Sequence, residues 1–308
     1  MKEYRQEILV VNRKSGELQT ELIPHTIKVA MRMIYGTGRL RPHPHKVRVL
    51  LKLLTVVEGA QNDKPKSAKK IAQFVAFHKI DMSEYEISDV SRFASFNEFF
   101  YRKLKAGMRP VPLDDCVAVS PADCRLNVFP SVDAATKLWI KGTGFTLEAL
   151  TQSAAVAQQF DGGSIIVARL APQDYHRFHA PVAGKVGALT MLQGAFYTVN
   201  PIAIRTNLPV FAENARCWTL LETKEFGDVL FVAVGATLVG SINYTAKQGD
   251  VVRRGDELGF FAFGGSTTIV VFKRGTIEFD HDLLLNSQKP IETLVQQGGR
   301  VGIAKNKK

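Results

Sequence analysis

The segment Phe261–Val271 places a serine between two glycines and a run of β-branched residues, directly after a turn-like Arg-Arg-Gly-Asp sequence. Gly265 has no side chain, so its carbonyl carbon can be approached closely and its backbone can adopt strained angles. Ser266 could therefore attack the carbonyl of the preceding residue and form an ester by an N-to-O acyl shift. Elimination across that ester would leave a dehydroalanine, which hydrolyses to a pyruvoyl group on a new chain terminus. The alternative is a Gly-Gly bulge that interrupts a strand.

The composition of the 308-residue chain is that of an ordinary folded protein, with 45% hydrophobic residues and enough length for one large or two modest domains. The formal net charge of +11 should attract polyanions, and nucleic acid and an anionic membrane both fit it. Neither a zinc-finger spacing nor an aromatic-rich RNA-binding signature is present. We therefore expect an anionic membrane surface and no nucleic acid among the partners.

The three cysteines, Cys116, Cys124 and Cys217, form neither a metal-binding pair nor an even-numbered disulfide set, so we expect reduced thiols, no metal site and an intracellular location. No apolar run approaches the length of a membrane-spanning helix, and residues 1–6 do not form a secretory signal. Any contact with a membrane should therefore be peripheral. The sequence leaves open which organelle membrane is used, which oligomer forms, and whether the chain is part of a longer protein.

Residues 21–110 carry apolar side chains at helical spacing with Lys and Arg between them, which predicts a helical N-terminal region over residues 1–116. The basic segment Lys64–Lys70 is expected to be a solvated connector, with contact to anionic lipid as the alternative. The predicted helices cover residues 27–35, 47–57, 71–77 and 96–104.

From Val117 onward, short β-branched or alternating segments separated by Gly, Pro and Asn predict an antiparallel β domain over residues 117–308. The phrases His179–Lys185 and Val251–Leu258 resemble the two hairpin-like halves of a biotinyl/lipoyl-type barrel sandwich. The predicted fold class is α+β, with a helical N-terminal cap packed on an antiparallel β domain of barrel-sandwich-like character. The predicted strands cover residues 138–140, 164–170, 185–192, 229–234, 237–242, 258–263 and 267–273.

Ser266 needs a base, and the base needs a group that orients it, as in serine hydrolases. His176 and His179 lie three positions apart, between Pro172 and Pro181. Residues three apart face opposite sides of a strand but share one face of a turn, and the two prolines limit regular structure here. A turn that presents both histidines to one site is one interpretation, and two structural histidines are the other.

Asp123 lies in the tight loop Ser120–Cys124, where the predicted helical region meets the β domain. As an acceptor for one of the histidines, it would fix the tautomer of that ring. The alternative is an Asx turn, in which the carboxylate accepts from the backbone of its own loop. Many chains of this length contain a serine, a histidine and an aspartate, so the triple alone decides little.

Longer sequence motifs, taken in their order along the chain, are more specific than the combination of a serine, a histidine and an aspartate. The aspartate loop, the double-histidine phrase and the Gly-Ser-Thr phrase together resemble the phosphatidylserine decarboxylase family, from about residue 18 to about residue 290. Gly264 and Cys124 stand where many members have Leu and Gly, but neither difference removes a reacting group. The matching phrases are Phe96–Leu104, Ser120–Asp123, Lys141–Leu147, Ala171–His179, Val234–Ile242 and Gly264–Thr267.

This resemblance implies a proenzyme that matures into a pyruvoyl-dependent decarboxylase. At the matching positions, Asp123 and His179 would activate Ser266 for cleavage of the bond after Gly265, and Ser266 would become the covalent pyruvoyl cofactor. His176 would meet the substrate carboxylate or handle the proton after CO2 leaves. The two cleavage products, which would remain associated as a heterodimer, are residues 1–265 and 266–308.

A pyruvoyl ketone condenses with a primary amine and accepts the electrons released when a neighbouring carboxylate leaves, as pyridoxal phosphate does in other enzymes. The substrate must then carry a free amine beside a carboxylate. The resemblance implies phosphatidylserine, converted to phosphatidylethanolamine and CO2. Two alternatives stay open: decarboxylation of a free amino acid, and a non-processed barrel-sandwich binding module, for which no lysine stands at an obvious hairpin tip.

Basic and apolar residues alternate within residues 27–57, a pattern that suits a helix lying in an anionic membrane interface. The alternative is that the apolar residues form the core of the cap. The basic residues are Arg32, Arg39, Arg41, Lys46, Arg48 and Lys52, and the apolar ones are Met31, Met33, Ile34, Leu50, Leu51 and Leu53.

Overall fold

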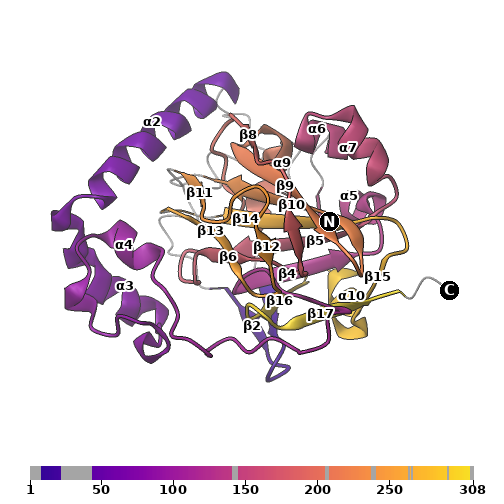
Figure 1. Ribbon diagram of the computed structural model, residues 1–308. Coiled ribbons are helices and arrows are strands. Elements are labelled where there is room, and N and C mark those ends of the chain that lie inside the picture. Colours follow the sequence, from indigo (N-terminus) through magenta and orange to yellow (C-terminus); the bar gives the residue numbers. More distant parts are fainter. Residues whose placement is uncertain are drawn as a thin grey trace, which may run out of the picture.

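The structure is a computed structural model that describes residues 8–21, 44–140, 145–204, 208–236, 241–262, 264, 266–289 and 291–305, with the backbone alone for residues 44–50, 52, 54 and 202. A helical cap lies to one side of a larger body of strands and short helices (Figure 1). The cap comprises α2 (Pro44–Asn62), η1 (Pro65–Lys70), α3 (Ile71–His78), η2 (Met82–Glu84), η3 (Val90–Arg92) and α4 (Phe96–Phe100).

The body is organised around one large sheet, in which β14 is a central strand. Over its whole length β14 pairs antiparallel with β10 on one side and with β5 on the other. Within the described sheet, β1 and β16 form a parallel pair. The strand order is β12 (Val251–Val252), β7 (Gly184–Val186), β9 (Arg216–Thr223), β10 (Gly227–Gly235), β14 (Ser266–Phe272), β5 (Ser164–Leu170), β4 (Cys124–Phe129), β16 (Ile291–Val295), β1 (Leu9–Asn12) and β2 (Leu18–Thr20), with β8 (Thr190–Leu192) beside β9.

Two smaller sheets and several short helices complete the body. One small sheet has the order β11 (Ile242–Tyr244), β13 (Glu257–Phe261) and β6 (Arg177–His179), and the other has β15 (Ile277–Phe279), β17 (Arg300–Ala304) and β3 (Val117–Val119). The helices are α5 (Val132–Leu138), α6 (Leu147–Thr151), α7 (Ala154–Gln159), α8 (Pro201–Ile204), α9 (Val210–Glu213) and α10 (His281–Ser287).

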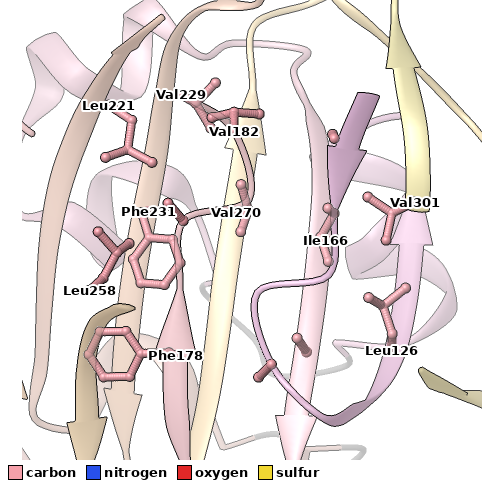
Figure 2. Close-up of a cluster of buried hydrophobic side chains, with 14 of the residues drawn as sticks. Leu126, Ile166, Phe178, Val182, Leu221, Val229, Phe231, Leu258, Val270 and Val301 are labelled. Atoms are coloured by element: carbon pink, nitrogen blue, oxygen red, sulfur yellow. The ribbon is translucent and has the colours of Figure 1, made fainter. Parts of the chain in front are cut away.

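Side chains along β14 alternate between two cores, because successive residues of a strand point to opposite faces of a sheet. Val270 faces a core shared with the small sheets, whereas Ile269 faces a core that also contains residues of α5, α6, α7 and α9. Figure 2 shows the first core, in which Phe178 of β6 stacks on Phe231 of β10 with ring centroids 5.7 Å apart. The small sheet that carries β6 is thereby fixed against the large one.

The cap has a small core of its own, made mostly of aromatic rings. Phe96, Phe99 and Phe100 of α4 are buried together with Ile71 and Phe93. The Phe93 and Phe99 rings meet edge to face, with centroids 5.5 Å apart and an interplanar angle of 86°. This is a preferred geometry for aromatic pairs and fixes α4 within the cap.

Local signals explain where α4 begins and ends. Ser95 is its N-cap and accepts from the backbone N–H of Glu98, as serine at this position commonly does. The helix ends at Phe100, not at Leu104 as predicted, because Tyr101 leaves the helical conformation and the chain turns toward the body. That turn delivers Arg102 to the backbone of the double-histidine phrase.

The predicted α+β class is confirmed, and the two barrel-sandwich phrases are adjacent, since β12 pairs with β7 and β13 with β6. The helical expectation was wrong for residues 9–20. They form a hairpin whose first strand extends the large sheet beside β16, because Val10 alternates with more exposed neighbours and is buried there. The division between residues 116 and 117 stays a prediction, and the predicted helix at 27–35 lies outside the described residues.

Two further local predictions were wrong. Residues 138–140 are not a strand, because Ser131 caps α5 and Val132 and Ala135 bury one face of that helix, which runs to Leu138. The lysines of the basic segment are exposed, as expected of a solvated connector, but Pro65–Lys70 forms a 3-10 helix and not a loop. Its Ser67 hydroxyl is buried and hydrogen-bonded to the carbonyl of Lys64.

Candidate active site

Ser266 is the first residue of β14 and is fully buried. It is paired with Gly235 of β10 on one side and with Leu170 of β5 on the other. Its hydroxyl has no hydrogen-bond partner among the described residues. Buried polar groups are nearly always satisfied, since an unmade hydrogen bond is costly in free energy. The hydroxyls of Thr267 and Thr268, the next two residues of β14, are also buried without a described partner.

The chain approaches Ser266 through an unusual backbone conformation. Gly264 has a φ of +132°, a region that residues with a Cβ rarely adopt. Gly265, whose carbonyl belongs to the predicted scissile bond, lies outside the described residues. A cavity of about 200 Å³ adjoins this end of the sheet, and Gly235, the ladder partner of Ser266, is part of its lining. Its lining also includes Met191, Phe196 and Ile242.

His176 is buried just before β6 and carries its proton on Nδ1. Nδ1 lies 2.9 Å from the carbonyl oxygen of Asp174 and donates to it, while Nε2 has no partner among the described residues. Burial lowers the pKa of His176 to about 3, and backbone hydrogen bonding at Asp174 and Gly264 offsets only part of this effect. At neutral pH the ring is therefore uncharged.

His179 ends β6 and is held at both nitrogens. Nδ1 donates to the carbonyl of Gly255 at 2.8 Å, so Nε2 accepts from the hydroxyl of Tyr175 at 3.1 Å. Burial lowers the pKa of His179, and the bond to Gly255 and the charges of Glu257 and Asp123 only partly oppose this. His179 is thus also neutral, with Nε2 as the acceptor.

The carbonyl that holds His179 comes from a turn that requires glycine. Gly255 has a φ of +83°, and a Cβ there would lie 2.6 Å from a methyl carbon of Val111. Its N–H donates to the carbonyl of Ala180 at 2.9 Å, which ties the turn to the residue after His179. The Arg-Arg-Gly-Asp segment therefore fixes the tautomer of this histidine.

Asp123 is engaged by an arginine and not by a histidine in the described structure. Its carboxylate accepts from Nε and Nη2 of Arg109, at 3.0 and 2.7 Å, and from the backbone N–H of Gln297 at 2.8 Å. Arg109 also pairs with Glu84 of the cap at 2.7 Å. The Asx turn is therefore not formed, and neither is the expected hydrogen bond to a histidine. Asp123 acts on His179 through its charge, which raises the pKa of that ring.

The structure brings some of the predicted site residues closer together than others. His176 lies against the backbone of Gly264, two residues before Ser266. His179 and Asp123 are within electrostatic range of each other, but no hydrogen bond joins Ser266, His179 and Asp123 in series among the residues that are described. His176 thus lies in the turn just before β6 and His179 at the end of the strand itself, and the two buried rings have different partners.

Five buried charged side chains form an ion-pair network beside this region. Arg169 pairs with Glu21 at 2.8 Å and also with Glu292. Arg125 pairs with Asp174 and lies 3.3 Å from Glu21. The network joins the N-terminal hairpin, β4, β5, β16 and the double-histidine phrase, so it links segments that are distant in sequence.

The network also determines where His176 can lie. The Asp174 carboxylate accepts from the backbone N–H of Ala171 at 2.8 Å in addition to its pair with Arg125, and its carbonyl accepts from His176. Burial raises the pKa of Asp174, although the charge of Arg125 opposes this. The position of the His176 ring therefore depends on a buried carboxylate and on its counterion.

Several residues of the site were missed by the sequence analysis. Tyr175 lies within the double-histidine phrase, and its position next to His176 was the available signal. Arg109 follows the cap in a Met-Arg-Pro sequence, and nothing local marks it as the partner of Asp123. Gly255 could have been suspected from its turn sequence, but its bond to a histidine 76 positions away could not.

Comparisons with known proteins agree with the resemblance found in the sequence. A family model described as phosphatidylserine decarboxylase matches residues 96–302. The chain is 47% identical over 297 residues to phosphatidylserine decarboxylase proenzyme 3 of Schizosaccharomyces pombe, covering 96% of this chain and 31% of that protein. It is 39% identical over 303 residues to the phosphatidylserine decarboxylase proenzyme of Fusobacterium nucleatum, covering 98% of this chain and 99% of that protein. The chain spans between 26% and 48% of the length of four relatives from yeasts and rice.

Replacing Arg125 by Met would leave Asp174 buried without its counterion. In a Ser266→Ala background, which keeps one covalent chain, we expect the free energy of unfolding at pH 7 to fall by about 3–5 kcal/mol, as for other broken buried pairs. Because burial raises the pKa of Asp174 above its unfolded value, the folded state favours the protonated carboxyl. The deficit should therefore shrink as the pH is lowered toward about 4. Chemical denaturation at several pH values measures it.

The matched control is Arg300→Met, which removes a half-exposed arginine paired with Asp280. Its effect on the free energy of unfolding should stay below about 1 kcal/mol, the usual range for surface pairs. A deficit for Arg125→Met that is equally small, or that does not change with pH, would show that Asp174 does not depend on this counterion.

Proposed function

Since the chain belongs to the phosphatidylserine decarboxylase family, we propose that it cleaves its own Gly265–Ser266 bond and then converts phosphatidylserine to phosphatidylethanolamine and CO2. The observation that carries the proposal is the state of Ser266, a buried hydroxyl without a described partner at the head of a central strand. Thr267 and Thr268 share that state, so what distinguishes Ser266 is its place directly after the Gly-Gly pair, at the point where the strand begins. A proenzyme needs that hydroxyl as its nucleophile.

A pyruvoyl group derived from Ser266 fits the described residues. It would replace a hydroxyl that lacks a described partner. Gly264 already has a backbone conformation that suits a reaction at the nearby Gly265–Ser266 bond. When present, the group supplies an electron-accepting carbonyl for the departure of CO2. The cavity beside Gly235 offers space for a small polar head group at this end of the sheet.

His179 suits the role of base for Ser266 during self-cleavage. Gly255 holds the Nδ1 proton, so Nε2 can accept the proton from the serine hydroxyl once the Tyr175 hydroxyl moves aside. Asp123 supports this step through its negative charge, which stabilises the imidazolium that forms. In this assignment the tautomer is set by a backbone carbonyl, and the carboxylate supplies electrostatic stabilisation.

The two products of cleavage are expected to stay associated as a heterodimer. Residues 266–308 contribute β14, which pairs along its length with β10 and β5 of the other product. They also contribute β16, which pairs with β4 and β1. Separating the products would expose both cores of the body, so strand pairing and burial both oppose dissociation.

His176 suits the handling of protons at the decarboxylation step. A neutral imidazole cannot form an ion pair with a substrate carboxylate, so of its two expected roles the proton role fits better. Nε2 can take the proton that a substrate ammonium loses to become a free amine. It can then return one proton to the carbon that CO2 has left, so the ring ends the cycle as it began.

Peripheral docking to an intracellular anionic membrane is a further part of the proposal. No described helix combines the length and the apolar character needed to cross a bilayer. Leu53 and Val56 of α2 and Phe77 of α3 are exposed on the cap, which also carries exposed lysines in and just before η1. Apolar side chains beside cations suit an anionic interface. The lysines are Lys64, Lys66, Lys69 and Lys70, whereas residues 31–41 of the predicted docking helix lie outside the described residues.

The purified protein should consist of two chains that separate under denaturing conditions, with masses that match cleavage between Gly265 and Ser266. Ser266→Ala should remain a single chain, because alanine has no oxygen to form the ester. Intact mass spectrometry measures both. Ser91→Ala, at an exposed position in the cap, is the control and should be processed normally. Efficient cleavage of Ser266→Ala at this bond would refute the mechanism.

The same mass measurement tests the two activating residues. His179→Ala should block cleavage, and Asp123→Asn should slow it severely because the charge that stabilises the imidazolium is lost. If His179→Ala is cleaved at the normal rate while His176→Ala is not, the roles of the two histidines are the reverse of those proposed.

His176→Ala should still mature into two chains with a pyruvoyl terminus but should decarboxylate phosphatidylserine poorly. The expected loss is about 10²–10⁴-fold, the usual contribution of one positioned acid–base group. Pyruvoyl content by mass and CO2 release from labelled lipid, measured on one preparation, give turnover per cofactor. Normal turnover would return His176 to a structural role. Free serine and an aromatic amino acid, assayed in parallel, test the alternative of a soluble substrate.

Leu53→Ser combined with Phe77→Ser should weaken binding to phosphatidylserine-containing vesicles by about tenfold or more, since two exposed apolar side chains lose their burial in the interface. Vesicle sedimentation measures the effect, and turnover of detergent-solubilised substrate should not change. Leu285→Ser, at a similarly exposed apolar position on α10, is the control. Equal binding of both variants and the parent would exclude this face of the cap.

A further inference from the structure

His176 is held by the cap as well as by the body. The Phe100 ring at the end of α4 lies on the imidazole of His176, with ring centroids 3.8 Å apart and an interplanar angle of 35°. Both side chains are fully buried. One face of the imidazole is therefore covered by a side chain of a different structural unit.

Arg102 donates a hydrogen bond to the same backbone carbonyl that accepts from His176. Its Nη2 donates to the carbonyls of Gln173 and Asp174, at 3.1 and 3.4 Å, and to the hydroxyl of Tyr85 at 3.0 Å. The same Asp174 carbonyl accepts from Nδ1 of His176. The guanidinium also lies over the Tyr85 ring, 4.3 Å from its centroid, so its position is fixed from within the cap.

These contacts also set the electrostatic surroundings of His176. The charged groups that act on it are two guanidiniums, Arg102 after α4 and Arg125 on β4, and both disfavour the imidazolium, as burial does. The backbone hydrogen bonds at Asp174 and Gly264 favour the charged form, and the one at Asp174 is stronger than the effect of either guanidinium, but burial outweighs it. Arg102 of the cap and Arg125 of the body act in the same direction as burial.

We propose that Phe100 and Arg102 are positioning residues for His176. Phe100 excludes water from the face of the ring, and Arg102 fixes the carbonyl that holds the Nδ1 proton, so that Nε2 is presented unprotonated. In this view the cap prepares the site for proton transfer and does more than attach the protein to a membrane. The inference rests on the proposed function, since that function gives His176 its task.

The first experiment uses the unprocessed Ser266→Ala chain, so it needs neither cofactor nor activity. NMR titration of the seven histidines, with His176 assigned from the spectrum of His176→Gln, gives its pKa and tautomer. With the cap intact, we expect His176 to stay neutral down to about pH 5, with its proton on Nδ1. If His176 instead titrates near pH 6.5, or carries its proton on Nε2, this measurement alone overturns the proposal, before any residue of the cap is replaced.

The second experiment replaces the ring. In the same background, Phe100→Leu should raise the pKa of His176 by about one unit or more, because water reaches the imidazole. The matched control is Phe96→Leu in the same helix, whose ring packs against Phe74 and Phe99 and not against His176. A shift of equal size in the control would mean general loosening of the cap, and no shift for Phe100→Leu would mean that the ring has no such role.

The third readout uses the mature protein. Phe100→Leu with Ser266 intact should still form two chains and a pyruvoyl terminus, whereas turnover per cofactor should fall by about 10- to 100-fold, as expected for a misplaced group. Since unprotonated Nε2 is required, activity should fall further as the pH drops through the raised pKa, a loss that the parent does not show in that range. An unchanged pH profile would overturn the proposal. Absence of decarboxylation in the parent would instead refute the proposed function and leave the titrations valid.

Discussion

The two-sided pairing of β14 is the constraint on which the rest of the site depends. Ser266 opens that strand, and its ladder with Gly235 and Leu170 begins at the serine itself. From Ser266 onward the strand is fixed by hydrogen bonds on both sides and by two cores. Bond cleavage at this point can create a reactive chain terminus without disturbing the sheet, because no strand is interrupted.

Burial decides the chemistry of both histidines. An imidazolium is poorly solvated in an apolar interior, so His176 and His179 are neutral and each must carry its proton on one nitrogen. In both rings a backbone carbonyl accepts from Nδ1, from Asp174 in one case and from Gly255 in the other. The two rings thus share one tautomer but have different neighbours, and the proposed function gives each a different proton transfer.

Buried arginines join the cap to the body. Arg102 reaches from the cap to the backbone of the double-histidine phrase, and Arg109 links Glu84 of the cap to Asp123. Arg177 runs in the opposite direction, donating to the carbonyl of Tyr101 at 2.9 Å. Guanidinium groups suit such junctions because several donors in a fixed plane can satisfy carbonyls and carboxylates at once. Each of the three contacts involves a residue within or beside the candidate site. The position of the cap therefore affects the positions of the site residues.

The sequence by itself determined the class of fold and the candidates for the reacting groups. The serine after two glycines, the two histidines and the aspartate were visible as short phrases, and strands such as β5 and β14 followed from β-branched runs. Only the tertiary structure decided the partner of Asp123, the proton positions on both rings and the contact of Phe100 with His176. The reason is physical: apart from the local bond between His176 and Asp174, these contacts join residues far apart in the chain, as in Phe100 with His176, His179 with Gly255, and Asp123 with Gln297. Hydrogen bonds of that kind depend on how sheets and cap pack, and packing leaves no periodic pattern in the chain.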